Sequence, residues 1–124
     1  MDDRSQIEQN IRSFIEAYNS GDIAGVLECY DDDVIKLRNG APPERKPELS
    51  LRLADVFEQF ITHLDVVNEE IVVDGEIAFA RGRLKVSLNA RTGDSSQVFE
   101  RRFLEIWRKA DGRWLVFRTM DNIA

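Results

Sequence analysis

Apolar residues recur every three or four positions in three N-terminal segments, a spacing that is typical of amphipathic helices. The first helix is predicted to begin at a capping box over residues 5–8 and to end at Gly21, which suits a left-handed cap. Asp22 is expected to cap a second, shorter helix that continues to Tyr30. Pro47 suits the first position of a third helix, whose apolar face comprises Leu49, Leu53, Val56, Phe57, Phe60 and Ile61.

After the third helix the apolar pattern changes to alternation, which predicts strands with one buried face. Strands are expected over residues 63–73 and 77–90, and the Asp74-Gly75 dipeptide between them is a strong turn signal. A short strand over residues 34–38 precedes the third helix. The predicted order is therefore helix, helix, strand, helix and four antiparallel strands.

The last two strands, residues 98–109 and 113–121, are expected to form one long antiparallel hairpin. A three-residue loop would close it, with Gly112 in the left-handed conformation. In that register the facing pairs are Trp107 with Leu115, Glu105 with Phe117, Phe103 with Thr119 and Arg101 with Asp121. Neither face of the hairpin is clearly polar, so both faces are expected to be partly covered. The charged residues of this face would then line a cavity.

Length and composition restrict the class of protein. A chain of 124 residues fits one domain over residues 1–124, and 43% hydrophobic residues indicate a globular chain. The net charge of −6 argues against a nucleic-acid partner, because phosphate binding needs a concentrated basic surface. No apolar run reaches membrane length and the N-terminus has no signal-like apolar stretch. A cytoplasmic protein without a membrane partner is therefore expected.

The sequence offers little chemistry for a metal or a cofactor. Cys29 is the single cysteine, so no intramolecular disulfide or cysteine-cluster metal site is expected, and a buried thiol is the default. The acidic run at residues 31–33 lacks the spacing of a calcium loop and is interpreted as a solvated turn. No phosphate loop, nucleophile elbow or zinc motif is present. The protein is expected to contain no metal and no organic cofactor.

Several local signals resemble the nuclear transport factor 2-like superfamily, which includes ketosteroid isomerases, SnoaL-like polyketide cyclases and the association domain of calmodulin-dependent kinase. The resembling segments are Ala17-Tyr18-Asn19-Ser20-Gly21-Asp22, Tyr30-Asp31-Asp32-Asp33-Val34, Asp74-Gly75-Glu76-Ile77-Ala78 and Glu105-Ile106-Trp107-Arg108-Lys109-Ala110-Asp111-Gly112-Arg113-Trp114. The resemblance, closest to stand-alone SnoaL-like domains, implies an α+β cone. In it three N-terminal helices pack in a strongly curved, mainly antiparallel sheet, with a pocket at the open end and a homodimer through the outer sheet face.

The resemblance does not extend to the known active sites. Ketosteroid isomerases use a carboxylate base, a tyrosine and a protonated acid, and the matching positions here are Arg38, Phe14 and Phe103 or Leu104. Steroid isomerisation by that mechanism is therefore not expected. The kinase association domain lines its pocket with arginines, and the matching positions here are Glu105 and Asp121, of opposite charge.

Four titratable residues are candidates for chemistry. Glu105 should lie among aromatic rings, which tends to raise the pKa of a carboxyl and suits acid/base work. The alternative is an ion pair with Arg38, Lys36 or Arg118. Arg101 and Asp121 should face each other, either as a structural ion pair or as a dyad with Asp121 as base. His63 is expected at the end of the third helix, exposed or capping, with a proton carrier at the pocket mouth as the alternative.

Two classes of function remain open from the sequence. One is a general acid/base isomerase, cyclase or lyase acting on a small molecule, with Glu105 and Asp121 as catalytic candidates. The other is a non-catalytic ligand-binding or dimerisation module. The expected ligand-binding residues are Phe14, Tyr18, Arg38, Arg101, Phe103, Trp107 and Phe117. The expected homodimer contact comprises Leu104, Ile106, Trp114, Val116 and Met120, because together they would form an exposed apolar patch.

Overall fold

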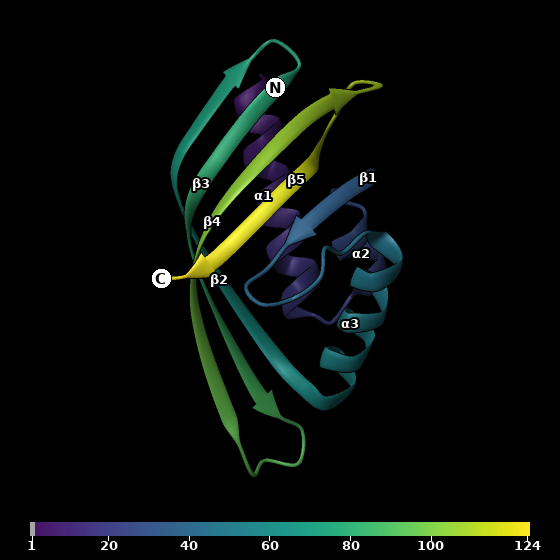
Figure 1. The fold of residues 1–124 in the computed structure, drawn as a ribbon, viewed down its shortest axis with the longest axis vertical. Coiled ribbons are helices and arrows are strands. Elements are labelled where there is room, and N and C mark those ends of the chain that lie inside the picture. Colours follow the sequence, from purple (N-terminus) through teal and green to yellow (C-terminus); the bar gives the residue numbers. More distant parts are fainter. Residues whose placement is uncertain (1) are drawn as a thin grey trace.

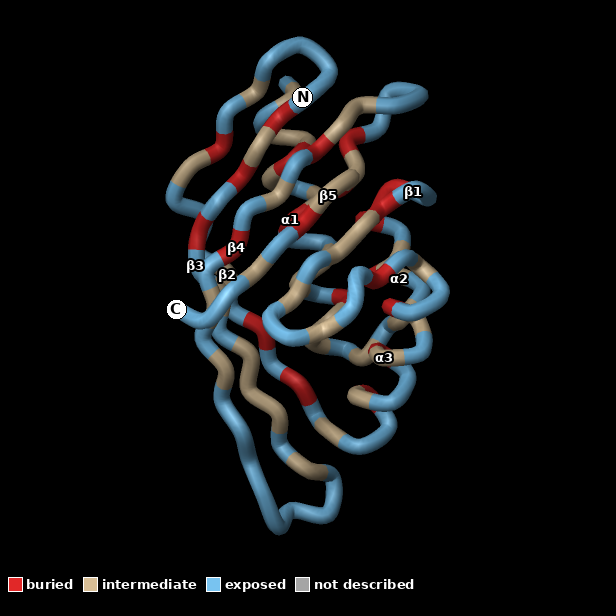
Figure 2. Tube along the Cα trace, viewed as in Figure 1, coloured by how far each residue is buried: buried red, intermediate tan, exposed pale blue. Residues whose placement is uncertain are grey.

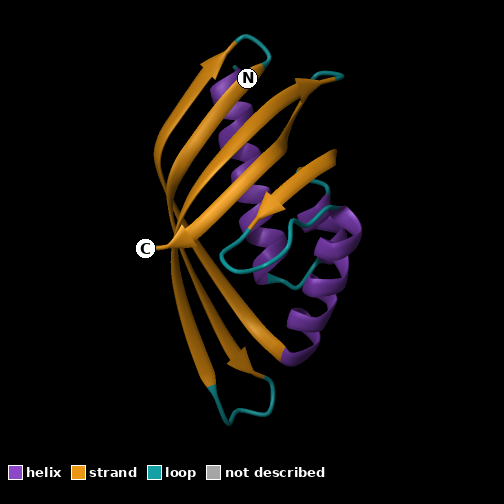
Figure 3. Cartoon of the chain, in the orientation of Figure 1, coloured by secondary structure: helices purple, strands orange, loops and turns teal. Residues whose placement is uncertain are grey.

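The computed structural model describes residues 2–124 and has a strongly curved sheet with three helices on its concave side (Figure 1, Figure 3). The elements are α1 (Asp3–Asn19), α2 (Ile23–Leu27), β1 (Tyr30–Leu37), α3 (Lys46–Gln59), β2 (Phe60–Asp74), β3 (Ile77–Ala90), β4 (Ser96–Ala110) and β5 (Arg113–Ile123). Among the described residues, no helix is long and apolar enough to cross a membrane.

The five strands form one sheet in the order β1-β5-β4-β3-β2. Strand β1 runs parallel to β5, and each of the other neighbouring pairs is antiparallel. The predicted α+β cone with a mainly antiparallel sheet is confirmed. Because the helices cover the concave side, the inward residues of every strand face either the helices or the space between helices and sheet.

The boundaries of all three helices differ from the prediction. Helix α3 begins at Lys46, one residue before the predicted Pro47, and ends at Gln59, so Phe60 and Ile61 start β2 instead of completing its apolar face. Helix α1 begins one turn before the expected capping box, because the Asp2 side chain accepts a hydrogen bond from the Ser5 amide at 2.7 Å. It ends as predicted, with Gly21 at a φ of 70°. Asp22 caps α2 by accepting from the Gly25 amide, as expected. The helix stops at Leu27, however, because Tyr30 already pairs with β5 as the first residue of β1.

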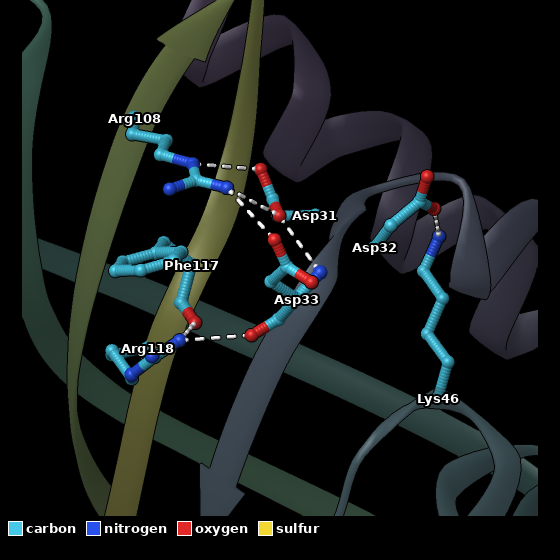
Figure 4. A network of polar contacts seen from close by, with 7 residues as sticks. All are labelled: Asp31, Asp32, Asp33, Lys46, Arg108, Phe117 and Arg118. Atoms are coloured by element: carbon cyan, nitrogen blue, oxygen red, sulfur yellow. Dashed lines mark hydrogen bonds and ion pairs between the residues drawn. The ribbon is translucent and has the colours of Figure 1, made fainter.

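The acidic run at residues 31–33 is part of β1 and not the predicted turn. It bulges out of register with β5 and is held there by arginines of the last hairpin (Figure 4). The Arg108 guanidinium donates to both oxygens of Asp31 at 2.9 and 3.0 Å, and Arg118 Nη1 donates to the Asp33 carbonyl at 2.9 Å. The Phe117 ring lies between the two guanidinium groups, with distances of 4.0 and 3.8 Å from its centre. These carboxylates therefore anchor an edge strand.

The last hairpin has a shorter turn than predicted. Ala110 pairs with Arg113, so the loop contains only Asp111 and Gly112. Both have positive φ, 53° and 75°, which is the geometry of a type I′ turn and matches the twist of the flanking strands. This shortening moves the pairing by one residue, and Trp107 faces Val116 instead of the predicted Leu115.

A bulge at Phe117 shifts the register by one further residue. Ile106 pairs with Arg118 and Trp107 with Val116, which leaves Phe117 unpaired on β5. Between the turn and the bulge, the observed pairing differs from the predicted pairing by one residue. Trp114 and Val116 therefore point inward, where they are 2% and 3% exposed. Beyond the bulge, the observed pairing differs from the predicted pairing by two residues. Because side chains alternate between two faces, this returns the side chains of β5 to the faces predicted for them. Thr119, which pairs with Glu105, therefore stays on the inner side.

The buried core lies between the helices and the middle of the sheet, whereas the turn that joins β3 and β4 is exposed (Figure 2). The most deeply buried large side chains of the core are Trp107, Ile7, Leu49, Val26 and Val34. The start of α1 is fixed to the last hairpin through Asp3, whose Oδ1 accepts from Trp114 Nε1 at 2.9 Å and from Lys109 Nζ at 3.0 Å. The inward position of Trp114 thus connects the first helix to the last two strands.

We expect Gly82→Ala to destabilise the fold by about 1–3 kcal/mol or more, as overpacking a closed site does. Gly82 pairs with Asn68 beside a bulge in β2, and a Cβ there would collide with the Val67 carbonyl oxygen. The control is Gly112→Ala, where nothing lies within 4 Å and only left-handed strain of about 1–2 kcal/mol is added. Urea unfolding of both variants measures the difference. A loss at Gly82 no larger than at Gly112 would contradict the close approach.

Candidate ligand-binding cavity

A cavity of about 350 Å³ lies between the three helices and the concave face of the sheet. All eight helices and strands contribute side chains to it, and most of these are apolar. Alternate residues of β4 form one continuous wall, as expected for a strand whose side chains alternate between two faces: Phe99, Arg101, Phe103, Glu105 and Trp107.

The cavity brings together all of the sequence-predicted site residues except one. Those that line it are Phe14, Tyr18, Arg38, Arg101, Phe103, Glu105, Trp107 and Asp121. The exception is Phe117, which the bulge turns to the opposite side of the sheet, against Arg108 and Arg118. The expected contact of Glu105 with Phe117 is therefore wrong. The binding and catalytic roles of the lining residues stay predictions.

Glu105 is the most perturbed carboxyl of the cavity. Burial raises its pKa to about 7, and the nearby Lys36 charge and the Trp107 indole N–H offset only part of that rise. Part of its surface remains accessible because it borders the cavity. Tyr30 lies close enough for the two groups to interact, since burial and then the Glu105 charge both raise the pKa of the Tyr30 hydroxyl. The carboxyl therefore lies near both a phenol and an indole.

None of the expected cations pairs with Glu105. Lys36 instead forms an ion pair with Asp121, with 3.4 Å between Nζ and Oδ2 and both side chains largely buried. Arg38 binds Glu44, and Arg118 lies on the other side of the sheet. Within the described part of the chain, Glu105 has no ion-pair partner. Burial is therefore the dominant influence on its pKa.

The expected pair between Arg101 and Asp121 does not form. With the register shifted by two residues, Arg101 faces Ile123 and Asp121 faces Phe103. Arg101 Nη1 donates to the Glu100 carbonyl at 3.0 Å, and its guanidinium lies 5.2 Å from the centre of the Phe99 ring. The cation that pairs with Asp121 comes from β1, which lies next to β5 in the sheet.

Trp107 contributes a polar group that the sequence did not single out. Its ring is 2% exposed. Its indole N–H makes no hydrogen bond of good geometry among residues 2–124, although it lies close enough to the Glu105 carboxyl to oppose the rise in that group's pKa. Leaving a buried donor unsatisfied costs about 1–3 kcal/mol. Because Trp107 lines the cavity, an acceptor atom of a bound molecule could satisfy this N–H.

Arg52 and Glu44 are further site residues that the sequence analysis missed. Arg52 Nε donates to Glu44 Oε2 at 2.8 Å, and Arg38 Nε donates to Glu44 Oε1 at 3.0 Å. Both arginines line the cavity. A signal for Arg52 was available, since it lies three positions after Leu49 and one before Leu53, within the apolar stripe of α3.

Two other titratable residues lie apart from this chemistry. His63 is on β2 rather than at the end of α3, is largely exposed, and contacts the Asp65 carboxylate at 3.2 Å. It is not among the residues that line the cavity. Cys29 is buried as expected, and burial raises the pKa of its thiol to about 11. Within residues 2–124, no group of three or more histidine, cysteine or acidic side chains is arranged to hold a metal ion.

The comparison with protein families identifies a sequence relationship that covers most of the chain. Residues 11–117 match the SnoaL-like domain. The chain belongs to the SnoaL-like domain family. The family assignment agrees with the cone fold and with the predicted resemblance. No match is found among proteins with curated descriptions.

Solved structures similar to this SnoaL-like chain share its fold at low sequence identity. A conserved protein from Planctomyces limnophilus is 23% identical with a TM-score of 0.93, covering 98% of this chain and 96% of that one. A ketosteroid isomerase-like protein from Erwinia carotovora atroseptica is 24% identical with a TM-score of 0.82, covering 96% and 94%. An NTF-2-like protein of unknown function from Shewanella oneidensis is 20% identical with a TM-score of 0.73, covering 96% and 98%. At these identities the likeness concerns the fold alone.

We expect Glu105 to make the protein less stable as the pH rises through neutrality. Its pKa is about 7 in the folded state and near 4.5 when unfolded, so the folded state retains the proton in that interval. Below pH 4.5 both states are protonated and no penalty exists. Between pH 5.5 and 8 the loss should be about 2 kcal/mol, at about 1.4 kcal/mol per pKa unit.

Chemical denaturation of the wild type and of Glu105→Gln at both pH values isolates this contribution, because all other titrating groups are shared. Glu100→Gln, at an exposed position of the same strand, is the matched control and should behave like the wild type. An identical pH dependence in the wild type and Glu105→Gln would show that the carboxyl has an ordinary pKa.

Proposed function

We propose that this SnoaL-like protein binds a small organic molecule in the cavity and that Glu105 acts on it as a general acid or base. The observation that carries the proposal is a cavity of about 350 Å³ that the protein's own side chains leave open and whose wall includes a carboxyl with a pKa of about 7. Proton transfer is most efficient when the catalytic pKa lies near the working pH. A carboxyl with an ordinary pKa would hold almost no proton at neutrality.

The neighbours of Glu105 favour proton transfer next to a carbonyl group. The unsatisfied Trp107 N–H can donate to a carbonyl oxygen, while the Glu105 carboxylate, two residues along the same face of β4, removes a proton from the adjacent carbon. Isomerases, cyclases and lyases that pass through an enolate share this step. We assign Asp121 the role of holding Lys36 rather than of transferring a proton, because its carboxylate is occupied by that ion pair.

The second candidate is a non-catalytic protein that stores or senses a small molecule. It would use the same cavity, and the unsatisfied Trp107 N–H supports ligand binding equally in both cases. A cone filled by its own side chains would have favoured a purely structural module. The two candidates differ in whether Glu105 has a chemical role, which a substitution at that position tests.

We expect the protein to accelerate exchange of the α-protons of α-tetralone, a bicyclic apolar ketone, in D₂O. Glu105→Gln should reduce the protein-dependent rate by about 10²-fold or more, as loss of a general base does. Proton NMR of the ketone measures the exchange, and Glu100→Gln is the control. Binding of the ketone with no acceleration by the wild type would favour the non-catalytic candidate.

We also propose that the protein forms a homodimer through the outer sheet face, with a smaller contact than the sequence predicted. Trp114 and Val116 cannot take part, because both point inward and are buried. The remaining predicted residues, Leu104, Ile106 and Met120, are 41%, 37% and 48% exposed. Cross-strand pairing extends this outer patch to Phe79 and Val72. Exposed apolar patches of this kind commonly mark interfaces, and a two-fold contact is the commonest soluble assembly.

We expect the wild type to be dimeric at high micromolar concentration, and Ile106→Asp combined with Met120→Asp to make it monomeric. Two buried charges at a two-fold contact would face their own copies without compensation. Leu51→Asp is the control, since Leu51 is 75% exposed on α3 and lies outside the outer patch. Light scattering after size exclusion measures the mass. A monomeric wild type would refute the outer-patch dimer.

A further inference from the structure

The cavity has a cationic side, although the whole chain has a net charge of −6. The basic residues that line it are Lys36, Arg38, Arg52 and Arg101, whereas the acidic residues that line it are Glu105 and Asp121. A cleft lined by charges of one sign between low-dielectric walls focuses its field and attracts ligands of the opposite sign. The partners of each cation show where it remains uncompensated.

Two of the four cations share a single carboxylate. Glu44 is 7% exposed and accepts from Arg38 Nε and Arg52 Nε, one on each oxygen, at 3.0 and 2.8 Å. Glu44 is itself positioned by two backbone hydrogen bonds with Lys36, at 2.8 and 2.9 Å. The carboxylate therefore orients both guanidinium groups at the cavity wall and neutralises only one of them.

The Nε contacts leave the outer edges of both guanidinium groups available. Among the described residues, no hydrogen bond is made by the terminal Nη groups of Arg38 or Arg52. Arg52 also lies near Tyr18 and Tyr30, where burial raises the pKa of each hydroxyl and the Arg52 charge opposes that rise. Its guanidinium thus acts on the interior of the cavity. The N–H donors on two oriented guanidinium edges suit hydrogen bonds to the oxygen atoms of a carboxylate or phosphate group.

The other two cations do not change this balance. Lys36 is neutralised by Asp121. Within residues 2–124, Arg101 contacts a carbonyl oxygen and the Phe99 ring and has no carboxylate partner. With Glu105 protonated, the wall and Glu44 together therefore contain two positive charges without a carboxylate partner. An anionic ligand would supply the missing charge.

We propose that the ligand of this cavity is an organic anion with an apolar body, whose carboxylate or phosphate binds the free edges of Arg38 and Arg52. The inference rests on the proposed function, because it assumes that the cavity takes a small molecule. The apolar body would extend across the Leu49 side of α3 toward Trp107 and Glu105, which the cavity also contains. The arginine pair then orients the molecule so that its far end meets the acid.

Three probes of equal ring size test this inference: 1-naphthoate, 1-naphthyl phosphate and the neutral 1-naphthamide. Calorimetry gives the Kd of each for the wild type, Arg52→Gln, Arg38→Gln and the outer-face control Arg102→Gln. We expect one or both anions to bind at least about tenfold more tightly than the amide, as charge-assisted hydrogen bonds predict. This preference should be lost in both cavity variants and kept in Arg102→Gln. The preference is the ratio of the amide Kd to the anion Kd within one variant. A loss of stability that weakens both probes alike therefore does not change it.

Each outcome has a defined meaning. A preference for naphthoate alone assigns a carboxylate, and a preference for the phosphate ester alone assigns a phosphate. Equal binding of all three probes, or a preference that survives both arginine substitutions, overturns the anion inference and leaves the cavity as a neutral binding site. Failure of every probe to bind the wild type counts against the proposed binding function itself, and the anion inference fails with it.

Discussion

The bulge at Phe117 in β5 decides which side chains of the last hairpin face the cavity. Between the two-residue turn and the bulge, β5 turns Trp114 and Val116 inward to cover the core. Beyond the bulge the alternation is reset, and Thr119 and Asp121 face the cavity. If β5 continued to alternate regularly from Val116 without the bulge, it would present Arg118 and Met120 to the interior and leave Lys36 without its carboxylate. The Phe117 ring itself is held outside by Arg108 and Arg118, so the bulge is fixed from the outer face.

The ionic contacts around the cavity isolate one acid. Lys36 is occupied by Asp121, and Arg38 and Arg52 are occupied by Glu44, so the nearby cations are already held when Glu105 is buried. Burial then dominates its pKa. At Arg38 and Arg52 the same kind of contact leaves an excess of positive charge, because these two cations share the single carboxylate of Glu44. An acid near its titration point and an excess of positive charge are therefore two consequences of one arrangement of ion pairs.

A cavity that the protein's own side chains do not fill and an indole N–H without a well-formed hydrogen bond within residues 2–124 both reduce stability. The fold offsets these losses away from the cavity. Asp3 fixes the start of α1 to Trp114 and Lys109, and Arg108 fixes β1 to the last hairpin through Asp31. Both contacts surround the apolar core at the turn end of the hairpin. The opposite end of the sheet is left to form the cavity wall.

The amino-acid sequence alone predicted the order of the elements, the Asp22 cap, the start of α3 to within one residue and the inward face of β4, because caps and apolar periodicity depend on neighbours in the chain. The register of the hairpin, the outward position of Phe117 and the burial of Trp114 were decided only in the tertiary structure. A one-residue change at a turn or bulge reverses a face without altering the local pattern. The partners Lys36 with Asp121 and Arg52 with Glu44 were also decided there, because they depend on which strands and helices pack together.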